Sequence, residues 1–95
     1  MYVALIARDK PGALDTRLAT RTAHLEYVAQ TGVVRQAGPL LDSDDQMIGS
    51  LIILEVEDME AAKRWAAGDP YSKAGLFHDV ELIPWKKVKI GRAHV

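Results

Sequence analysis

The segment formed by residues 47–57 constrains the fold most, because it alternates as a strand does and yet is apolar on both sides. One side carries Ile48, Ser50, Ile52, Leu54 and Val56, and the other carries Gly49, Leu51, Ile53 and Glu55. Residues 2–8 repeat this two-sided apolar pattern. Strands of this kind lie inside a sheet whose two faces are both covered. We therefore expect central strands with helices on one face and a further apolar surface on the other.

Two helices are expected from the spacing of apolar residues and from their caps. Residues 13–31 carry apolar side chains at helical spacing, and Gly32 after them suits a left-handed C-cap. A second helix is expected over residues 59–67, with Asp58 as its N-cap. These helices separate the strands along the chain.

Two further strands complete the expected sheet. Residues 33–37 form a short strand that Gly38-Pro39 closes, because proline cannot donate to a strand ladder. The last strand covers residues 76–84, and residues 85–90 extend it as an edge segment whose lysines discourage further pairing. The order β-α-β-β-α-β predicts an α+β, ferredoxin-like fold with a four-stranded antiparallel sheet and both helices on one face. The uncovered face requires a partner, and we expect a homodimer stacked sheet on sheet.

Composition limits the classes of function. The chain has 95 residues with 12 basic and 13 acidic side chains, a net charge of -1, so neither nucleic acid nor a membrane surface is an expected partner. It has no cysteine, which excludes disulfides, thiolate nucleophiles and sulfur-ligated metals. No apolar run approaches the ~20 residues of a membrane span and no signal-peptide pattern follows Met1, so we expect a cytoplasmic protein. A single domain is expected over residues 1–90, and residues 91–95 are interpreted as a disordered end or a cloning remnant.

The helix over residues 13–31 places basic side chains beside an apolar stripe, which we expect to face the core. The stripe consists of Leu14, Leu18, Leu25 and Ala29. At about 100° per residue, Arg21 lies about 20° outside this stripe, with Arg17 and His24 further round on the same side. A guanidinium so close to the core must snorkel, pair with a carboxylate or face a polar cavity, because an unpaired buried charge is costly. Arg21 is therefore either a snorkelling edge residue or the anchor for an anion in a pocket.

Patterns that would indicate a metal site are weak. The acidic loop over residues 40–46 lacks the glycine and the distal glutamate of a calcium site, so we expect a solvated hairpin connection. His24, His78 and His94 share no helical or strand spacing. We expect neither a metal nor another cofactor.

His24 and Asp69 each have a structural interpretation as well as a chemical one. His24 alone is typical of a histidine at the boundary of the core. Asp69 precedes Pro70, so its carboxylate is placed to cap a short helix with the proline at the first helical position. Neither residue indicates catalysis by itself.

A combination of short motifs resembles a known family. The motifs are Arg17, His24-Leu25, Tyr27, Gly38-Pro39-Leu40, Gly49, Asp69-Pro70-Tyr71, Ala74-Gly75-Leu76 and Pro84-Trp85. Together they resemble the YCII-related (YciI-like) domain family over residues 1–90. The resemblance implies a dimeric α+β barrel with an active site built on a histidine and an aspartate, which correspond to His24 and Asp69. One branch of that family is associated with dehydrochlorination in aromatic degradation.

The residues and the resemblance together predict a small-molecule enzyme that works without a cofactor. Asp69 orients His24 as a general acid and base for proton abstraction, elimination such as dehydrochlorination, or isomerisation. The side chains expected to bind an anionic or aromatic substrate are Arg17, Arg21, Ser50 and Tyr71. The alternative is a non-catalytic module in which the same groups bind a small anion or serve regulation.

Overall fold

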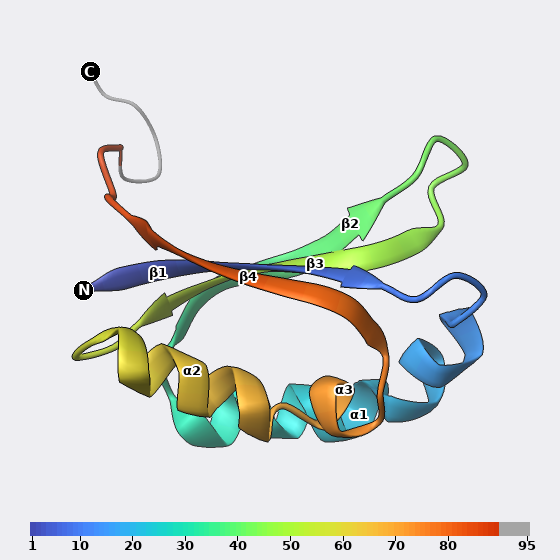
Figure 1. The fold of residues 1–95 in the computed structure, drawn as a ribbon, viewed down its shortest axis with the longest axis horizontal. Coiled ribbons are helices and arrows are strands. Elements are labelled where there is room, and N and C mark those ends of the chain that lie inside the picture. The colour runs from blue at the N-terminus through green and yellow to red at the C-terminus, as the bar shows by residue number, and fades with distance from the viewer. Residues whose placement is uncertain (90–95) are drawn as a thin grey trace.

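The structure, a computed structural model, describes residues 1–89. In chain order the elements are β1 (Tyr2–Asp9), α1 (Leu14–Thr31), β2 (Val34–Leu41), β3 (Met47–Glu55), α2 (Met59–Gly68), α3 (Pro70–Lys73) and β4 (Phe77–Trp85). The strands form one antiparallel sheet in the order β2-β3-β1-β4, and the helices lie on one face of it (Figure 1). The predicted α+β, ferredoxin-like fold is confirmed, with α3 as a short extra turn. The interpretation of residues 91–95 concerns residues outside the described part.

The core lies between the sheet and the helices. Its fully buried members are Val3, Leu5, Ala7, Ile52, Leu54, Ala62 and Trp65. Leu5 pairs opposite Ile52 and Val3 opposite Leu54, so alternate residues of β1 and β3 supply one shared apolar layer. Because this layer faces α1 and α2, its side chains determine the distance between the helices and the sheet.

No helix of residues 1–89 lies on the other face of the sheet (Figure 1). On this face Ala4 pairs opposite Ile53 and Ile6 opposite Leu51, as the two-sided pattern predicted. Ile83 of β4 lies opposite Ala4 on the same face. Leu51 and Ile83 are 41% and 43% exposed in the single chain. The central strands are thus covered on one side only.

Strand β2 continues through Gly38 and Pro39, so the expectation that these residues close the strand was wrong. Pro39 pairs opposite Ser50 and Leu40 opposite Gly49. Because β2 lies at the edge of the sheet, it tolerates a residue without an N–H group. The sequence indicates that Pro39 cannot donate to a strand ladder, but it does not show that β2 lies at the edge of the sheet, where such a residue is tolerated.

The extension expected after the last strand is also wrong over most of its length. Strand β4 ends at Trp85, and residues 86–89 form no strand. Residue 90 lies outside the described part of the chain.

The apolar stripe of α1 faces away from the core, contrary to expectation. Leu18 and Leu25 are 51% and 47% exposed, whereas Arg17 and His24 are 3% and 7% exposed. The helix wheel placed these residues correctly relative to one another, but it assumed that the apolar side is the buried one. Here Arg17 and His24 are buried because carboxylates from other parts of the chain pair with them, whereas Arg21 is exposed.

The acidic loop between β2 and β3 is a hairpin connection, as predicted, but it begins after Leu41 and not at residue 40. Asp42 Oδ1 accepts hydrogen bonds from the backbone N–H groups of Asp44 (2.8 Å) and Gln46 (3.0 Å). Within residues 1–89, no group of three or more acidic or histidine side chains is placed to hold a metal ion. None of the helices in this part of the chain is long and apolar enough to cross a membrane.

Candidate active site

A pocket of ≈ 190 Å³ opens between α1 and strands β2 and β3, next to α3. The structure brings five of the six predicted site residues to its wall: Arg17, Arg21, His24, Ser50 and Tyr71. The apolar part of the wall is formed by Leu25, Ala37, Gly38, Pro39, Met47 and Ile52. The sixth predicted residue, Asp69, lies behind His24. Residues from the first helix, the central strand and the last short helix thus converge on one cavity.

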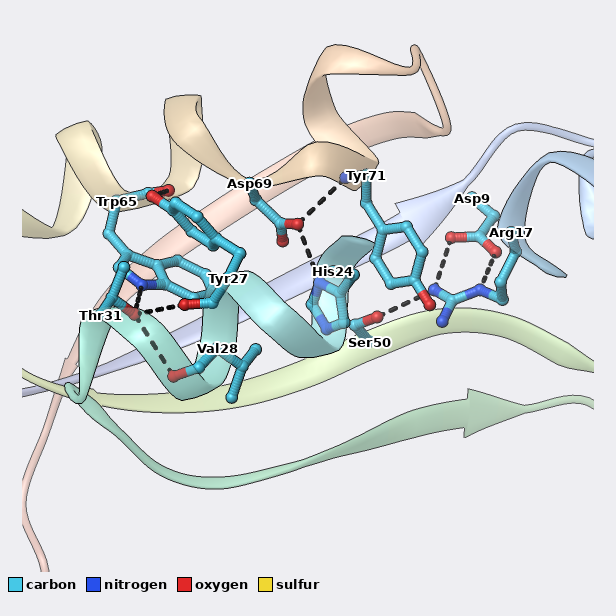
Figure 2. Close-up of polar contacts among 10 residues, drawn as sticks. All are labelled: Asp9, Arg17, His24, Tyr27, Val28, Thr31, Ser50, Trp65, Asp69 and Tyr71. Carbon is cyan, nitrogen blue, oxygen red and sulfur yellow. Dashed lines mark hydrogen bonds and ion pairs between the residues drawn. The ribbon is translucent and has the colours of Figure 1, made fainter. Parts of the chain in front are cut away.

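His24 and Asp69 meet although 45 positions separate them in the sequence. His24 Nδ1 lies 2.8 Å from Asp69 Oδ1, and Figure 2 shows the imidazole directed at the carboxylate. Both residues are buried, Asp69 with only 1% exposure. A carboxylate at Nδ1 favours the tautomer in which that nitrogen carries the proton, which leaves Nε2 free to accept one. Nε2 has no hydrogen-bond partner among residues 1–89, and His24 borders the pocket.

Asp69 also caps α3, as expected from its place before Pro70. Its Oδ1 accepts the backbone N–H of Tyr71 at 3.0 Å, and Pro70 occupies the first turn of the helix. The other oxygen, Oδ2, is buried and has no hydrogen-bond partner among the described residues. Buried polar atoms without partners are uncommon in folded proteins.

Arg17 forms a buried ion pair that sequence reasoning missed. Its Nε and Nη2 donate to the two carboxylate oxygens of Asp9 at 2.7 and 3.0 Å, and Nη2 also donates to Ser50 Oγ at 2.8 Å. Burial alone would lower the pKa of Arg17, but the hydrogen bond and charge of Asp9 outweigh it and raise that pKa above its usual value. A buried arginine requires a carboxylate partner, and this requirement could have predicted the pair. The helix wheel placed Arg21 nearer the apolar stripe, so a carboxylate partner was considered for Arg21 and not for Arg17.

The ring of Tyr71 lies between the side chains of His24 and Arg17. It stacks on the His24 imidazole with 4.0 Å between centroids and 14° between planes, and Arg17 Cζ lies 4.7 Å from the ring centroid. Figure 2 shows the ring between these two side chains. Burial raises the pKa of Tyr71, and the charges of Arg17 and Arg21 reduce this rise. The phenol is therefore neutral at physiological pH.

Arg21 lies at the mouth of the pocket and is exposed. It forms no ion pair with any carboxylate of residues 1–89. The sequence allowed Arg21 to snorkel, to pair with a carboxylate or to face a polar cavity. It pairs with no carboxylate of the described residues, and its side chain borders the pocket. The pocket thus contains one arginine that is tied to a carboxylate and one that is available to a ligand.

The arrangement combines a base with cationic groups in one small cavity. His24 Nε2 can take up a proton, and Arg17 and Arg21 can stabilise negative charge on a molecule bound beside it. Buried carboxylates hold His24 and Arg17, whereas Arg21 is exposed. Such a site suits proton transfer on a small anionic molecule.

Comparisons with known proteins agree with this architecture. Residues 1–86 match the model of the YCII-related domain. A protein of Haemophilus influenzae is 40% identical and protein YciI of Escherichia coli O6:H1 is 39% identical, each alignment covering 93% of this chain and 99% of the relative. The 5-chloro-2-hydroxyhydroquinone dehydrochlorinase of Burkholderia phenoliruptrix AC1100, solved in complex with 2,5-dihydroxybenzoquinone, superposes with a TM-score of 0.84 at 32% identity over 90% of this chain and 94% of that one. The chain therefore belongs to the YCII-related domain family.

Proposed function

We propose that this protein is a small-molecule enzyme that works without a cofactor and in which Asp69 orients His24 for proton transfer. The observation that carries the proposal is the buried contact of 2.8 Å between His24 Nδ1 and Asp69 Oδ1 at the wall of the pocket. The likeness to a dehydrochlorinase of the same fold, at 32% identity, supports a small-molecule enzyme. His24 Nε2 would take a proton from a substrate carbon or hydroxyl group.

Removal of the proton leaves an electron pair on the substrate. The reactions that this geometry can support differ in where that electron pair goes. In an elimination the pair forms a new double bond while a leaving group such as chloride departs with its bonding electrons. In an isomerisation the imidazolium returns the proton to another atom of the same molecule. In both cases negative charge develops on the substrate, and nearby cations lower the barrier.

Arg17, Arg21 and Ser50 would bind the anionic part of the substrate. Arg17 uses Nε and Nη2 on Asp9, which leaves Nη1 without a hydrogen bond among the described residues. Arg21 supplies a second, exposed charge. The pocket volume of ≈ 190 Å³ is below the usual range for drug-sized ligands, so the substrate would be a small molecule, of the size of a single ring or a short acid.

The same proposal includes a homodimer formed through the uncovered face of the sheet. Apolar side chains occupy the middle of that face, and ion pairs flank them where Arg8 binds Asp79 at 3.1 Å and Glu81 at 2.7 Å. An apolar centre with a charged border is typical of an interface between subunits. A second copy would cover Leu51 and Ile83 without changing the pocket side of the sheet.

Proton abstraction can be tested with a panel of small molecules chosen to match the charge and size of the pocket. Small carboxylates, phosphates and hydroxylated quinones, including 2,5-dihydroxybenzoquinone, are first ranked by the thermal stabilisation that they give. The compounds that bind and have an acidic C–H group are then incubated in D2O, and loss of the proton signal is followed by NMR. Chlorinated hydroquinones are assayed in parallel for release of chloride.

The variants are His24→Gln and Asp69→Asn, with His78→Gln as a control because His78 is an exposed histidine outside the pocket. We expect His24→Gln to slow exchange or chloride release by about 100-fold or more, the usual contribution of a general base. The control should match the wild type. Exchange that is equally fast with the wild type and His24→Gln would contradict the role of His24 as the base. If compounds bind but exchange no faster with the wild type than in buffer, the protein is the alternative, a non-catalytic module that binds small anions or serves regulation.

A further inference from the structure

One residue contacts both members of the pair formed by His24 and Asp69. The backbone N–H of Tyr71 donates to Asp69 Oδ1, the same oxygen that His24 Nδ1 approaches. The ring of Tyr71 stacks on the His24 imidazole at 4.0 Å. Both contacts come from the backbone and the ring, so neither uses the hydroxyl group.

The ring of Tyr71 is itself held on several sides. The guanidinium of Arg17 lies over it at 4.7 Å from the centroid, and Asp9 fixes that guanidinium with two hydrogen bonds. Phe77 packs edge-on with 5.9 Å between centroids. Tyr71 is only 2% exposed, so its ring has little freedom to move. It therefore forms a rigid surface for whatever packs against it.

The imidazole needs such a surface, because a single hydrogen bond does not fix its orientation. The bond to Asp69 places Nδ1, but the ring can still turn about the line between the two atoms. The second side-chain torsion of histidine has a broad preference, so the chain itself does not select one plane. Stacking within 14° of the Tyr71 plane removes this freedom and gives Nε2 one direction.

We propose that Tyr71 is a positioning residue, whose ring fixes the plane of the His24 imidazole while its backbone N–H fixes the Asp69 oxygen. The kinetic part of this inference rests on the proposed function of His24 as a base. The geometric part does not, because the plane of an imidazole can be measured in a protein with no known substrate. The short order Asp69-Pro70-Tyr71 suits both contacts, since the capping carboxylate lies two residues before the ring.

Three variants separate the ring from the hydroxyl group. Tyr71→Phe keeps the ring and the backbone N–H, whereas Tyr71→Leu keeps the N–H and removes the stacking surface. Tyr71→Met serves if the leucine variant does not fold, because an unbranched side chain fills irregular gaps more readily. Phe77→Leu is the matched control: it alters the packing around Tyr71, and the ring that stacks on His24 remains.

The first measurement is the set of NOEs from the His24 ring protons to side chains of the pocket wall other than Tyr71, with the ring protons assigned by their loss in His24→Gln. These NOEs report the plane of the imidazole, whereas its ring-current shift would change whenever the Tyr71 ring is removed. We expect Tyr71→Phe and Phe77→Leu to keep the wild-type NOEs, and Tyr71→Leu to lose that pattern in a protein that still unfolds cooperatively. A wild-type pattern in folded Tyr71→Leu, or an equal loss in Phe77→Leu, would overturn the proposal.

The second measurement is the rate of proton exchange on the compound that the wild type exchanges fastest. We expect Tyr71→Leu to lower kcat by about tenfold or more with little change in KM, because misplacement of a reacting group by ~1 Å can cost up to 100-fold. Tyr71→Phe should lose less of kcat than Tyr71→Leu, because it retains the ring that stacks on His24. If Tyr71→Phe loses as much as Tyr71→Leu, the hydroxyl group is responsible and the proposal is wrong. If no bound compound exchanges with the wild type, the proposed function fails, and the NOEs of the His24 ring alone decide the role of Tyr71.

Discussion

At the scale of single residues, two buried carboxylates organise the pocket. Asp69 binds His24 and Asp9 binds Arg17, and the Tyr71 ring lies between the two basic side chains. Each charged group is buried only because a partner meets it, since an isolated ion in a protein interior is strongly unfavourable. Removing one member of such a pair should therefore lower the free energy of unfolding more than removing both members.

The ion pair of Arg17 and Asp9 offers a direct test of this point. Asp9→Asn leaves the Arg17 charge buried without its partner, and we expect it to lower the free energy of unfolding by about 3 kcal/mol. The double variant Asp9→Asn with Arg17→Met should recover part of this loss, because no charge remains buried. Urea unfolding of the single and double variants measures both. A double variant as unstable as the sum of its two single variants would contradict the expectation.

Arg21 should act on ligands and not on the fold, because it is exposed and borders the pocket. We expect Arg21→Met to change the free energy of unfolding by less than about 0.5 kcal/mol. It should weaken the binding of small carboxylates or phosphates by about tenfold, which corresponds to about 1.4 kcal/mol. Thermal-shift titrations measure both quantities, with Arg64→Met on α2 as the control. If no anion binds the wild type more tightly than Arg21→Met, Arg21 only snorkels.

The buried phenol of Tyr71 predicts how stability changes in alkali. Burial raises the pKa of Tyr71 above its usual value of 10.0, so the folded protein holds this proton more tightly than the unfolded chain. Stability from this group is complete below pH 10 and is lost as the pH rises above the unfolded value. Urea unfolding at pH 8 and pH 11 should show a smaller loss for Tyr71→Phe than for the wild type. Equal losses in the two proteins would contradict the prediction.

At the scale of elements, β1 and β3 approach each other unusually closely at one position. A Cβ atom at Gly49 would collide with the backbone carbonyl oxygen of Ala7, whereas a Cβ atom at Gly38 on β2 would meet nothing within 4 Å. Neither glycine has a positive φ, so the difference is one of space. The backbone of β1 cannot move aside without disturbing its ladder.

This contrast gives a matched pair of substitutions in neighbouring strands. We expect Gly49→Ala to lower the free energy of unfolding by about 1–3 kcal/mol, the usual cost of overpacking. Gly38→Ala should stay within about 0.5 kcal/mol of the wild type. Thermal or urea unfolding of the two variants measures the difference. Equal stability of the two variants would show that the strands can separate at little cost.

At the scale of the whole molecule, the uncovered sheet face predicts self-association. Leu51 on this face is 41% exposed and Leu18 on α1 is 51% exposed, so each could be replaced by lysine at similar cost in a monomer. We expect Leu51→Lys to dissociate or unfold the protein, because many dimers have no stable folded monomer. Leu18→Lys should leave the assembly unchanged.

Light scattering at micromolar concentration measures the mass of each protein. The wild type should have twice the chain mass of 10.5 kDa, and Leu18→Lys should match it. A wild type with the mass of one chain would refute the dimer. Loss of the dimer in both variants would assign the interface to α1 as well as to the sheet.

Local patterns in the sequence were sufficient to predict most of the fold. The order of elements follows from the alternation of apolar residues, and the Asp58 carboxylate caps α2 by accepting the N–H of Ala61 at 2.8 Å. Asp69 and Pro70 begin α3 as their spacing indicates. These features depend on atoms a few residues apart, so neighbouring positions in the chain already contain the information.

Only the tertiary structure decided which side of α1 is buried and which carboxylates meet its basic row. By its apolar content the stripe with Leu18 should face the core, yet Arg17 and His24 do, because β1 brings Asp9 and the turn before α3 brings Asp69. Burial of a charge depends on a partner that can lie 45 positions away, and no helical wheel contains that partner. The sequence by itself therefore determined the elements and their order, whereas the packing of those elements determined which faces became core and which became pocket.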